Sequence, residues 1–152
     1  MCGIVAYVGP RKAQPILLEA LSRLEYRGYD SAGLAILNGH GVEVRKKSGR
    51  IENLANACQA KPIQGELGIS HTRWATHGAP TNENAHPHLD QSGKLAVVHN
   101  GVIENFLELK EKLVQAGHTF LSDTDTEVLA HCLGEAYQKS KTKGEARLLG
   151  AV

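Results

Sequence analysis

The sequence predicts an α+β domain in which an antiparallel sheet is layered with helices. Strand patterns dominate the first part of the chain, a hairpin signal joins two of them, and helical patterns follow later. This order favours antiparallel pairing over a strictly alternating parallel fold. With 152 residues, of which 41% are hydrophobic, the chain has the size of one domain that buries its own core.

The first strand and helix follow directly from the N-terminus. Residues 2–8 form an apolar, partly β-branched run that Gly9-Pro10 ends, which predicts a strand covered on both faces. Pro15 suits a first helical turn, and an apolar stripe at helical spacing then predicts a helix that ends before Gly28: Ile16, Leu17, Ala20, Leu21 and Leu24. A polar loop is expected over residues 26–31.

A β-hairpin is predicted next. Residues 33–37 and 42–45 flank Asn38-Gly39-His40-Gly41, which is rich in residues that accept a positive φ. A short helix should follow, because apolar residues recur at helical spacing: Ile51, Leu54, Ala57 and Cys58. Residues 67–70 and 95–99 are two further strand candidates.

The second half of the chain contains a polar segment and two helices. Residues 71–88 hold four histidines and are too polar for a core, so we expect a loop long enough to fold over a ligand. Two apolar stripes predict the helices: Phe106, Leu109, Leu113 and Val114, ended by Gly117, and then Val128, Leu129, Cys132 and Leu133. An apolar pattern begins at residue 146 and stops abruptly, so we expect the domain to be incomplete at its C-terminal end.

Composition excludes several classes of partner. The formal net charge is +1, so no overall field attracts nucleic acid or an anionic membrane. No apolar run approaches the ~20 residues that span a bilayer, and we expect a cytoplasmic protein with a small polar ligand. The three cysteines are widely spaced, which argues against disulfides and CxxC sites. Cys58 and Cys132 fall on apolar helix stripes and are interpreted as core residues.

Cys2 has an unusual chemical property once Met1 is removed. Its α-amine then lies next to its thiol, so one residue can supply both a nucleophile and a base. The amine has an ordinary pKa of about 7.7 to 8.0, and roughly a tenth of it is therefore free base at pH 7. The alternative is that Cys2 is a small buried hydrophobic residue at the start of a strand.

Two charged residues could bind the ends of an amino acid. The guanidinium of Arg73 suits a carboxylate, which it can hold through two parallel hydrogen bonds; the alternative is a surface ion pair. Asp125 could bind an ammonium group. Alternatively, Thr124 and Glu127 form a capping box that starts a helix, and Asp125 merely favours the helix dipole.

A turn signal and a histidine cluster each allow two readings. The Asn100 side-chain amide and the Gly101 N–H could donate to a developing oxyanion, but an Asn-Gly pair after a strand is also a common turn. His86-Pro87-His88 could contribute to a metal site. There is no HExxH and there are no paired cysteines, and phosphate-binding glycine motifs are missing too, so we predict no metal and no cofactor.

Six segments together closely resemble the glutaminase domains of glucosamine-6-phosphate synthases, which are class II glutamine amidotransferases. They occur in the family's order: residues 2–5, 24–33, 71–78, 84–88, 98–101 and 124–127. The resemblance implies catalytic roles at or beside the nucleophile for four residues: Cys2, Asn100, Gly101 and Arg27. It implies glutamine-binding or pocket roles for six others: Arg73, Trp74, Thr76, His77, His86 and Asp125.

The resemblance also implies a fold, a reaction and a longer protein. The fold would be the four-layer αββα sandwich of N-terminal-nucleophile hydrolases, with residues 1–152 as an incomplete glutaminase domain. The reaction would convert L-glutamine to L-glutamate and ammonia through a γ-glutamyl thioester. Sugar isomerase domains outside this chain would use fructose 6-phosphate, in a full-length homodimer.

Two other functions remain open from the sequence alone. The chain could be a catalytically silent glutamine-binding fragment, because it is truncated or because Met1 is retained. It could also be a metallohydrolase whose metal is held by histidines.

Overall fold

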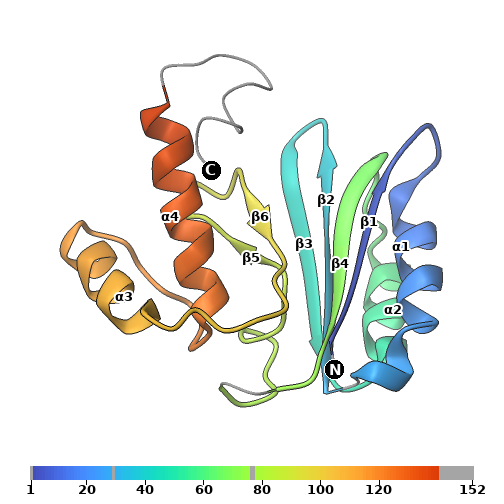
Figure 1. Cartoon of the computed structure of the whole chain (residues 1–152). Coiled ribbons are helices and arrows are strands. Elements are labelled where there is room, and N and C mark those ends of the chain that lie inside the picture. The colour runs from blue at the N-terminus through green and yellow to red at the C-terminus, as the bar shows by residue number, and fades with distance from the viewer. Residues whose placement is uncertain (1, 29, 76–77, 141–152) are drawn as a thin grey trace.

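A four-stranded antiparallel sheet forms the centre of the molecule. The computed structural model describes residues 2–28, 30–75 and 78–140. The strand order is β1-β4-β2-β3, where the strands are β1 (Gly3–Val8), β4 (Leu67–Arg73), β2 (Ser31–Asn38) and β3 (Gly41–Ser48). Helices α1 (Ala13–Ser22) and α2 (Ile51–Ala60) cover one face of this sheet, as Figure 1 shows. The chain joins α1 to β2 through a 3-10 turn, Glu25–Arg27.

The main hydrophobic core lies between this sheet and the two helices. Leu17 and Leu21 of α1, Leu34 and Ile36 of β2 and Leu54 of α2 are all fully buried. Burial of one such side chain stabilises the fold by about 1.5–3 kcal/mol. Cys58 belongs to the same cluster, so its interpretation as a core residue is confirmed.

The predicted hairpin is confirmed. Strands β2 and β3 pair antiparallel, with Leu37 opposite Val42 and Asn38 opposite Gly41. Gly41 has a φ of +124°, which L side chains rarely adopt, so the turn requires glycine there.

The prediction that the first strand is covered on both faces is wrong. Strand β1 lies at the edge of the sheet, and its exposure alternates along the strand. Ile4 is 40% exposed and Val8 is 77% exposed, whereas Val5 and Tyr7 pack against the core. Helix α1 covers one face only, which an apolar run by itself does not reveal.

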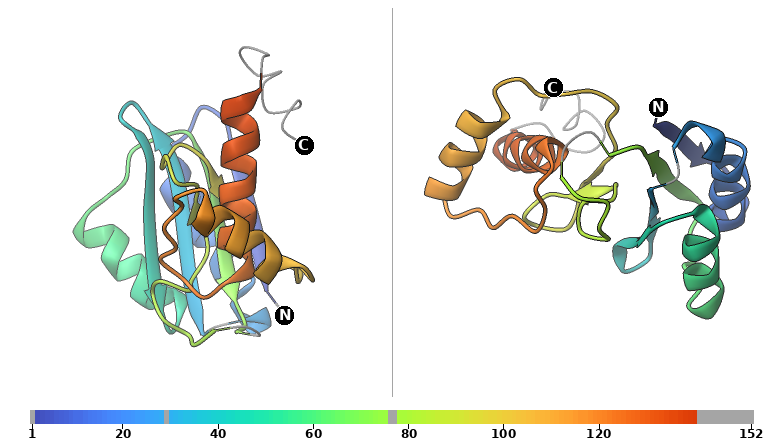
Figure 2. Two further views of the ribbon diagram at one scale, coloured as in Figure 1. Left: turned by 90° about the vertical axis from the view of Figure 1, so that its left-hand side faces the viewer. Right: turned by 90° about the horizontal axis from the view of Figure 1, so that it is seen from below.

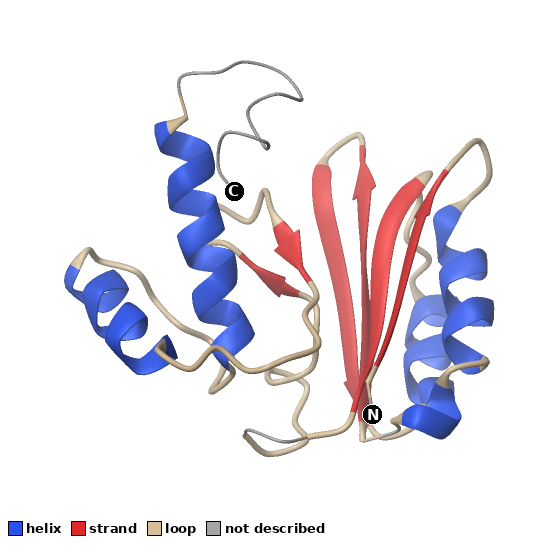
Figure 3. Cartoon of the chain, viewed as in Figure 1, coloured by secondary structure: helices blue, strands red, loops and turns tan. Residues whose placement is uncertain are grey.

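A second group of elements lies on the other side of the sheet. It consists of a two-stranded sheet, β5 (His88–Leu89) with β6 (Ala96–Val97), and of helices α3 (Phe106–Gln115) and α4 (Asp125–Lys139). Figures 2 and 3 show β5 and β6 between the four-stranded sheet and α4. The antiparallel sheet layered with helices confirms the predicted α+β class.

Both predicted helices of the second half are present, but the strand predictions there are less accurate. Gly117, with a φ of +91°, follows the end of α3 as expected. The expected strand over residues 95–99 is reduced to Ala96–Val97, and its partner β5 was not predicted. No helix among residues 2–28, 30–75 and 78–140 is long and apolar enough to cross a membrane.

The polar segment 71–88 is a loop over most of its described residues, but the expectation that it is too polar for a core is wrong. Strand β4 continues to Arg73, and the side chains of His71, Asn84, His86 and His88 are buried. The prediction failed because polar groups enter a core when hydrogen bonds satisfy them. Gly33 of β2 allows this segment to approach closely, since a Cβ there would lie 2.2 Å from the His86 carbonyl oxygen.

Candidate active site

Three chain segments that are distant in sequence meet at one end of the molecule. In Figure 1 the N-terminal ends of β1 and α4 and the C-terminal end of β4 lie at its lower end. Antiparallel pairing places Gly3 opposite Thr72, and so brings the N-terminus beside Arg73 and Trp74. The Gly3 N–H donates to the Thr72 hydroxyl over 3.0 Å and fixes this end of β1.

The Cys2 side chain lies against the backbone of Trp74. The Trp74 N–H donates to Cys2 Sγ over 3.2 Å, and the sulfur lies 3.8 Å from the Trp74 carbonyl oxygen. Cys2 is half-buried and precedes β1, so it is not the buried hydrophobic residue of the alternative interpretation.

Cys2 opens into a cavity of about 400 Å³. Its lining includes eight of the ten residues proposed from the sequence: Cys2, Arg27, Arg73, Trp74, His86, Asn100, Gly101 and Asp125. The other two, Thr76 and His77, lie outside the described residues. A second cavity, of about 720 Å³, lies beside Lys46, Glu127 and His131. Because none of the ten proposed residues lines it, the smaller cavity is the candidate active site.

Arg73 is a buried residue of β4, which excludes the surface ion pair considered above. Arg73 is only 5% exposed. Its guanidinium donates to the Ala79 and Gly78 carbonyl oxygens over 3.2 and 3.3 Å. These bonds orient the guanidinium at the wall of the cavity. A buried guanidinium is well suited to bind a carboxylate.

Asp125 begins α4 and also contacts the loop that follows Gly101. It is 7% exposed, and its Oδ2 accepts the Ile103 N–H over 2.8 Å. The carboxylate therefore both lines the cavity and anchors the segment that carries Asn100 and Gly101. A buried carboxylate at this wall can bind a cationic group of a ligand.

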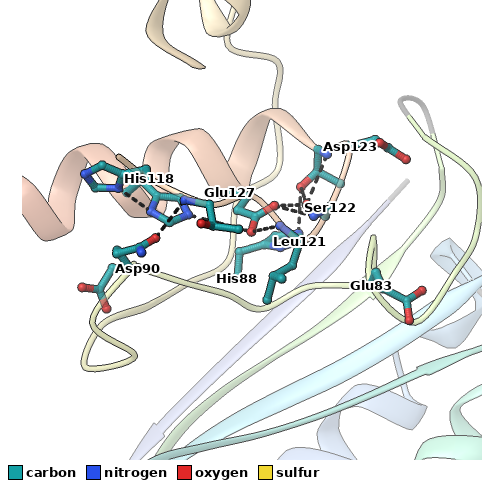
Figure 4. Close-up of polar contacts among 12 residues, drawn as sticks. Glu83, His88, Asp90, His118, Leu121, Ser122, Asp123 and Glu127 are labelled. Carbon is teal, nitrogen blue, oxygen red and sulfur yellow. Dashed lines mark hydrogen bonds and ion pairs between the residues drawn. The ribbon is translucent and has the colours of Figure 1, made fainter. Parts of the chain in front are cut away.

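The predicted capping box between Thr124 and Glu127 is wrong, because both side chains form other hydrogen bonds. Thr124 is the N-cap of α4, but its hydroxyl bonds to His88 Nε2 at 2.9 Å rather than capping the helix. The Glu127 carboxylate accepts the N–H groups of Leu121 and Ser122 over 2.8 and 2.7 Å, as Figure 4 shows. Burial raises the pKa of Glu127, but hydrogen bonds from the His131 and Ser122 side chains, together with these two N–H groups, outweigh it and lower the pKa to about 2. Glu127 thus holds the turn that presents Asp125.

Asn100 contacts two elements across the cavity wall. Its Nδ2 lies 3.4 Å from the Cys2 carbonyl oxygen, and its Oδ1 lies 2.8 Å from Nε2 of His71. The side chain is therefore held against both β1 and β4, which a plain surface turn would not require. An amide held beside a nucleophile can donate to a developing oxyanion.

Three buried histidines pack against one another, and two of them, His71 and His86, line the cavity. The rings of His71 and His86 stack with their centroids 4.3 Å apart, and His88 meets His86 edge-on. Burial disfavours the imidazolium form, and lowers the pKa of His71 to about 4 and that of His88 to about 3. The pKa of His86 is lowered further by burial and by the neighbouring His71. The three rings are therefore neutral at pH 7.

Neutral burial of these histidines predicts a specific pH dependence of stability. An unfolded histidine has a pKa of about 6.5, so below that pH the unfolded chain binds more protons than the folded one. We expect the free energy of unfolding to be highest above pH 6.5. It should fall between pH 6.5 and 4, by up to about 1.4 kcal/mol per pH unit for each histidine. Urea unfolding at pH 7 and pH 5 measures this slope.

Variants separate the buried histidines from other titrating groups. His88→Gln should reduce the slope by about one proton, because the lowered pKa of His88 contributes that part of it. An equal slope in the parent and in His88→Gln would contradict neutral burial of His88.

Several residues that line the cavity were not predicted from the sequence. Among them, His71 contacts the side chain of Asn100, a proposed catalytic residue. Alternate residues of a strand face the same side, so His71 and Arg73 share one face of β4. If the predicted strand 67–70 had been extended by three residues, to Arg73, the sequence would have placed His71 on the same face as Arg73. Among the described residues, no group of three His, Cys, Asp or Glu side chains is placed to hold a metal ion.

Comparison with known proteins adds a family model and close relatives. A model described as a glutamine amidotransferase domain matches residues 43–145. Glutamine–fructose-6-phosphate aminotransferase (isomerizing) of Thermus thermophilus is 57% identical over 152 residues, which are 100% of this chain and 25% of that protein. The enzyme of the same name from Aquifex aeolicus is 58% identical over 138 residues, which are 91% of this chain and 23% of that protein. The chain thus spans about a quarter of the length of these relatives.

Solved structures of more distant proteins share the fold. The glutamine phosphoribosylpyrophosphate amidotransferase of B. subtilis superimposes with a TM-score of 0.76 at 27% identity. It matches over 99% of this chain and 32% of its own. A structure described as the allosteric regulatory enzyme of purine biosynthesis gives a TM-score of 0.78 at 28% identity, with the same coverage.

Proposed function

Because the chain belongs to the glutamine amidotransferase domain family, we propose that it hydrolyses L-glutamine to L-glutamate and ammonia through a γ-glutamyl thioester on Cys2. One observation carries this proposal: Cys2 opens into a cavity that also contains a buried arginine, a buried aspartate and an asparagine amide. These are the groups that an amino acid with a reactive side-chain amide requires.

Recognition of glutamine would depend on the two buried charges. Arg73 would bind the α-carboxylate through its planar guanidinium, and Asp125 would bind the α-ammonium. Thr76, His77, His86 and Trp74 would complete the pocket, with Trp74 on the segment that controls the passage of ammonia. Opposite charges in the lining of the pocket would favour a zwitterion over an uncharged amide.

Catalysis would begin with attack of Cys2 Sγ on the side-chain amide carbon. Removal of Met1 would free the α-amine of Cys2, which takes the thiol proton and passes it to the departing nitrogen. The oxyanion would be stabilised by the Asn100 amide and the Gly101 N–H, with Arg27 beside the nucleophile. Cleavage of the C–N bond would release ammonia and leave the thioester. Water activated by the same amine would then release glutamate and restore Cys2.

The complete protein would extend well beyond this chain. We propose that residues 1–152 are a glutaminase domain incomplete at its C-terminal end, and that further strands extend the short β5–β6 sheet and complete its four-layer αββα sandwich. This is supported by the short second sheet and by relatives about four times as long. Use of the ammonia on fructose 6-phosphate, homodimer formation and a cytoplasmic location also remain predictions.

Labelling with a glutamine-like electrophile tests the site. A γ-halomethyl ketone analogue of glutamine should modify Cys2 alone, and excess glutamine should protect it. Cys58 and Cys132 serve as internal controls, because burial raises the pKa of both thiols and so lowers their thiolate fraction. Peptide mapping locates the adduct, and intact mass reports whether Met1 has been removed.

Glutamate release measured on the same sample separates the enzyme from the silent binder. Turnover together with the Cys2 adduct would support the proposal. Protection by glutamine without turnover would favour the silent glutamine-binding fragment, and an adduct on Cys58 or Cys132 instead of Cys2 would refute the site.

A further inference from the structure

We propose that His71 is a positioning residue that fixes the Asn100 side-chain amide with its nitrogen, rather than its oxygen, toward the reacting carbonyl group. The inference rests on the proposed function, because it assumes that Asn100 donates to an oxyanion in glutamine hydrolysis. His71 itself does not touch the substrate in this role.

The contacts of Asn100 determine which way its amide faces. The group 3.4 Å from the Cys2 carbonyl oxygen must be a donor, since that oxygen only accepts hydrogen bonds. Nδ2 therefore faces Cys2, and it has a second hydrogen for a substrate oxygen. The amide oxygen then faces Nε2 of His71 at 2.8 Å and needs a donor there. His71 must therefore carry its proton on Nε2.

The His71 ring is well placed to act as this donor. The residue is 1% exposed on β4, and its ring stacks on His86, so both its position and its plane are fixed. The His99 backbone also interacts with the ring and favours its charged form. Among the described residues, however, no hydrogen bond reaches Nδ1. This is the pattern of a neutral imidazole with one N–H, on Nε2.

Loss of this donor would leave the amide with two orientations. A primary amide turned by 180° would present Oδ1 to the cavity, where it would repel an oxyanion instead of stabilising it. The orientation matters for the oxyanion but hardly for the bound glutamine head group. The effect should therefore appear in kcat and not in KM.

A matched pair of amide variants tests the inference in the 152-residue chain. The glutamine nitrogen in His71→Gln can reach the place of the imidazole Nε2, whereas the shorter asparagine in His71→Asn cannot. We expect His71→Gln to retain kcat within about threefold, and His71→Asn and His71→Leu to lose about ten- to a hundredfold. KM for glutamine should change by less than about threefold in all three.

The rate at which iodoacetamide alkylates Cys2 separates a positioning role from a general structural one. If His71 only maintained the structure of the site, its variants would change this rate as well. Sulfur displaces iodide from a saturated carbon in this reaction, and no oxyanion forms. The rate should therefore be the same in the parent, His71→Asn and His71→Gln. In an Asn100→Ala background, His71→Asn should cause no further loss of kcat, because the group that it positions is gone.

Each other outcome has a definite meaning. Equal kcat in His71→Asn and His71→Gln would overturn the role of His71 alone. The same conclusion follows if alkylation falls as much as kcat, or if the two losses add in the double variant. A parent chain that binds glutamine but does not hydrolyse it would instead refute the proposed function, and with it the need for an oriented donor.

Discussion

Replacing Cys2 by alanine is expected to lower glutamine turnover by about four orders of magnitude or more. The variant removes the sulfur that would form the thioester, and removal of a covalent nucleophile costs this much in other enzymes that act through an acyl intermediate. Cys2 precedes β1 and does not belong to the hydrophobic core, so the fold should be retained. Glutamate release under saturating glutamine measures the loss, and the thermal midpoint should match that of the parent.

Two further variants sharpen this test. Cys2→Ser keeps the α-amine and the size of the side chain but replaces the thiol by a much weaker acid, so it should also lose most of the activity. Cys132→Ala on α4, well outside the candidate site, should retain normal kcat. If Cys2→Ala turned over glutamine at a rate similar to that of Cys132→Ala, the covalent mechanism would be wrong.

Replacing Asn100 by alanine is expected to lower kcat for glutamine by about 10²- to 10³-fold, with little change in KM. This range is typical for the removal of one oxyanion donor, because the interaction strengthens only as charge develops on the carbonyl oxygen. Steady-state kinetics of glutamate release measure both constants. The backbone N–H of Gly101 would remain, so the variant should keep measurable activity above that of Cys2→Ala.

The control for this variant is an asparagine far from the site. Asn53 lies on the exposed side of α2, where its amide donates to the Ser48 carbonyl, and Asn53→Ala should retain normal kcat. An increase in KM without a decrease in kcat for Asn100→Ala would mean that the amide binds the ground state of glutamine. Its role as an oxyanion donor would then be refuted.

The local elements of this chain could largely be read from its sequence. Period and turn chemistry are local properties, so the β2–β3 hairpin, α1, α2, α3 and α4 follow from apolar spacing and from residues such as Gly41 and Gly117. The chemistry of an N-terminal cysteine is equally local, because its nucleophile and base belong to one residue. Similarity to a known family then supplied the expected site residues.

Which segments meet was decided by tertiary structure alone. Strand β1 became an edge strand with one face uncovered, and four polar side chains of the segment 71–88 became buried: His71, Asn84, His86 and His88. Strand order and hydrogen-bond partners depend on residues far away in the chain. The contact between His71 and Asn100 joins residues 29 positions apart. The sequence by itself thus determined the helices and the hairpin, and it predicted Cys2 as the nucleophile. Only the three-dimensional structure determined how the amide of Asn100 is held, since a hydrogen bond between a strand and a loop far apart in sequence has no local signal.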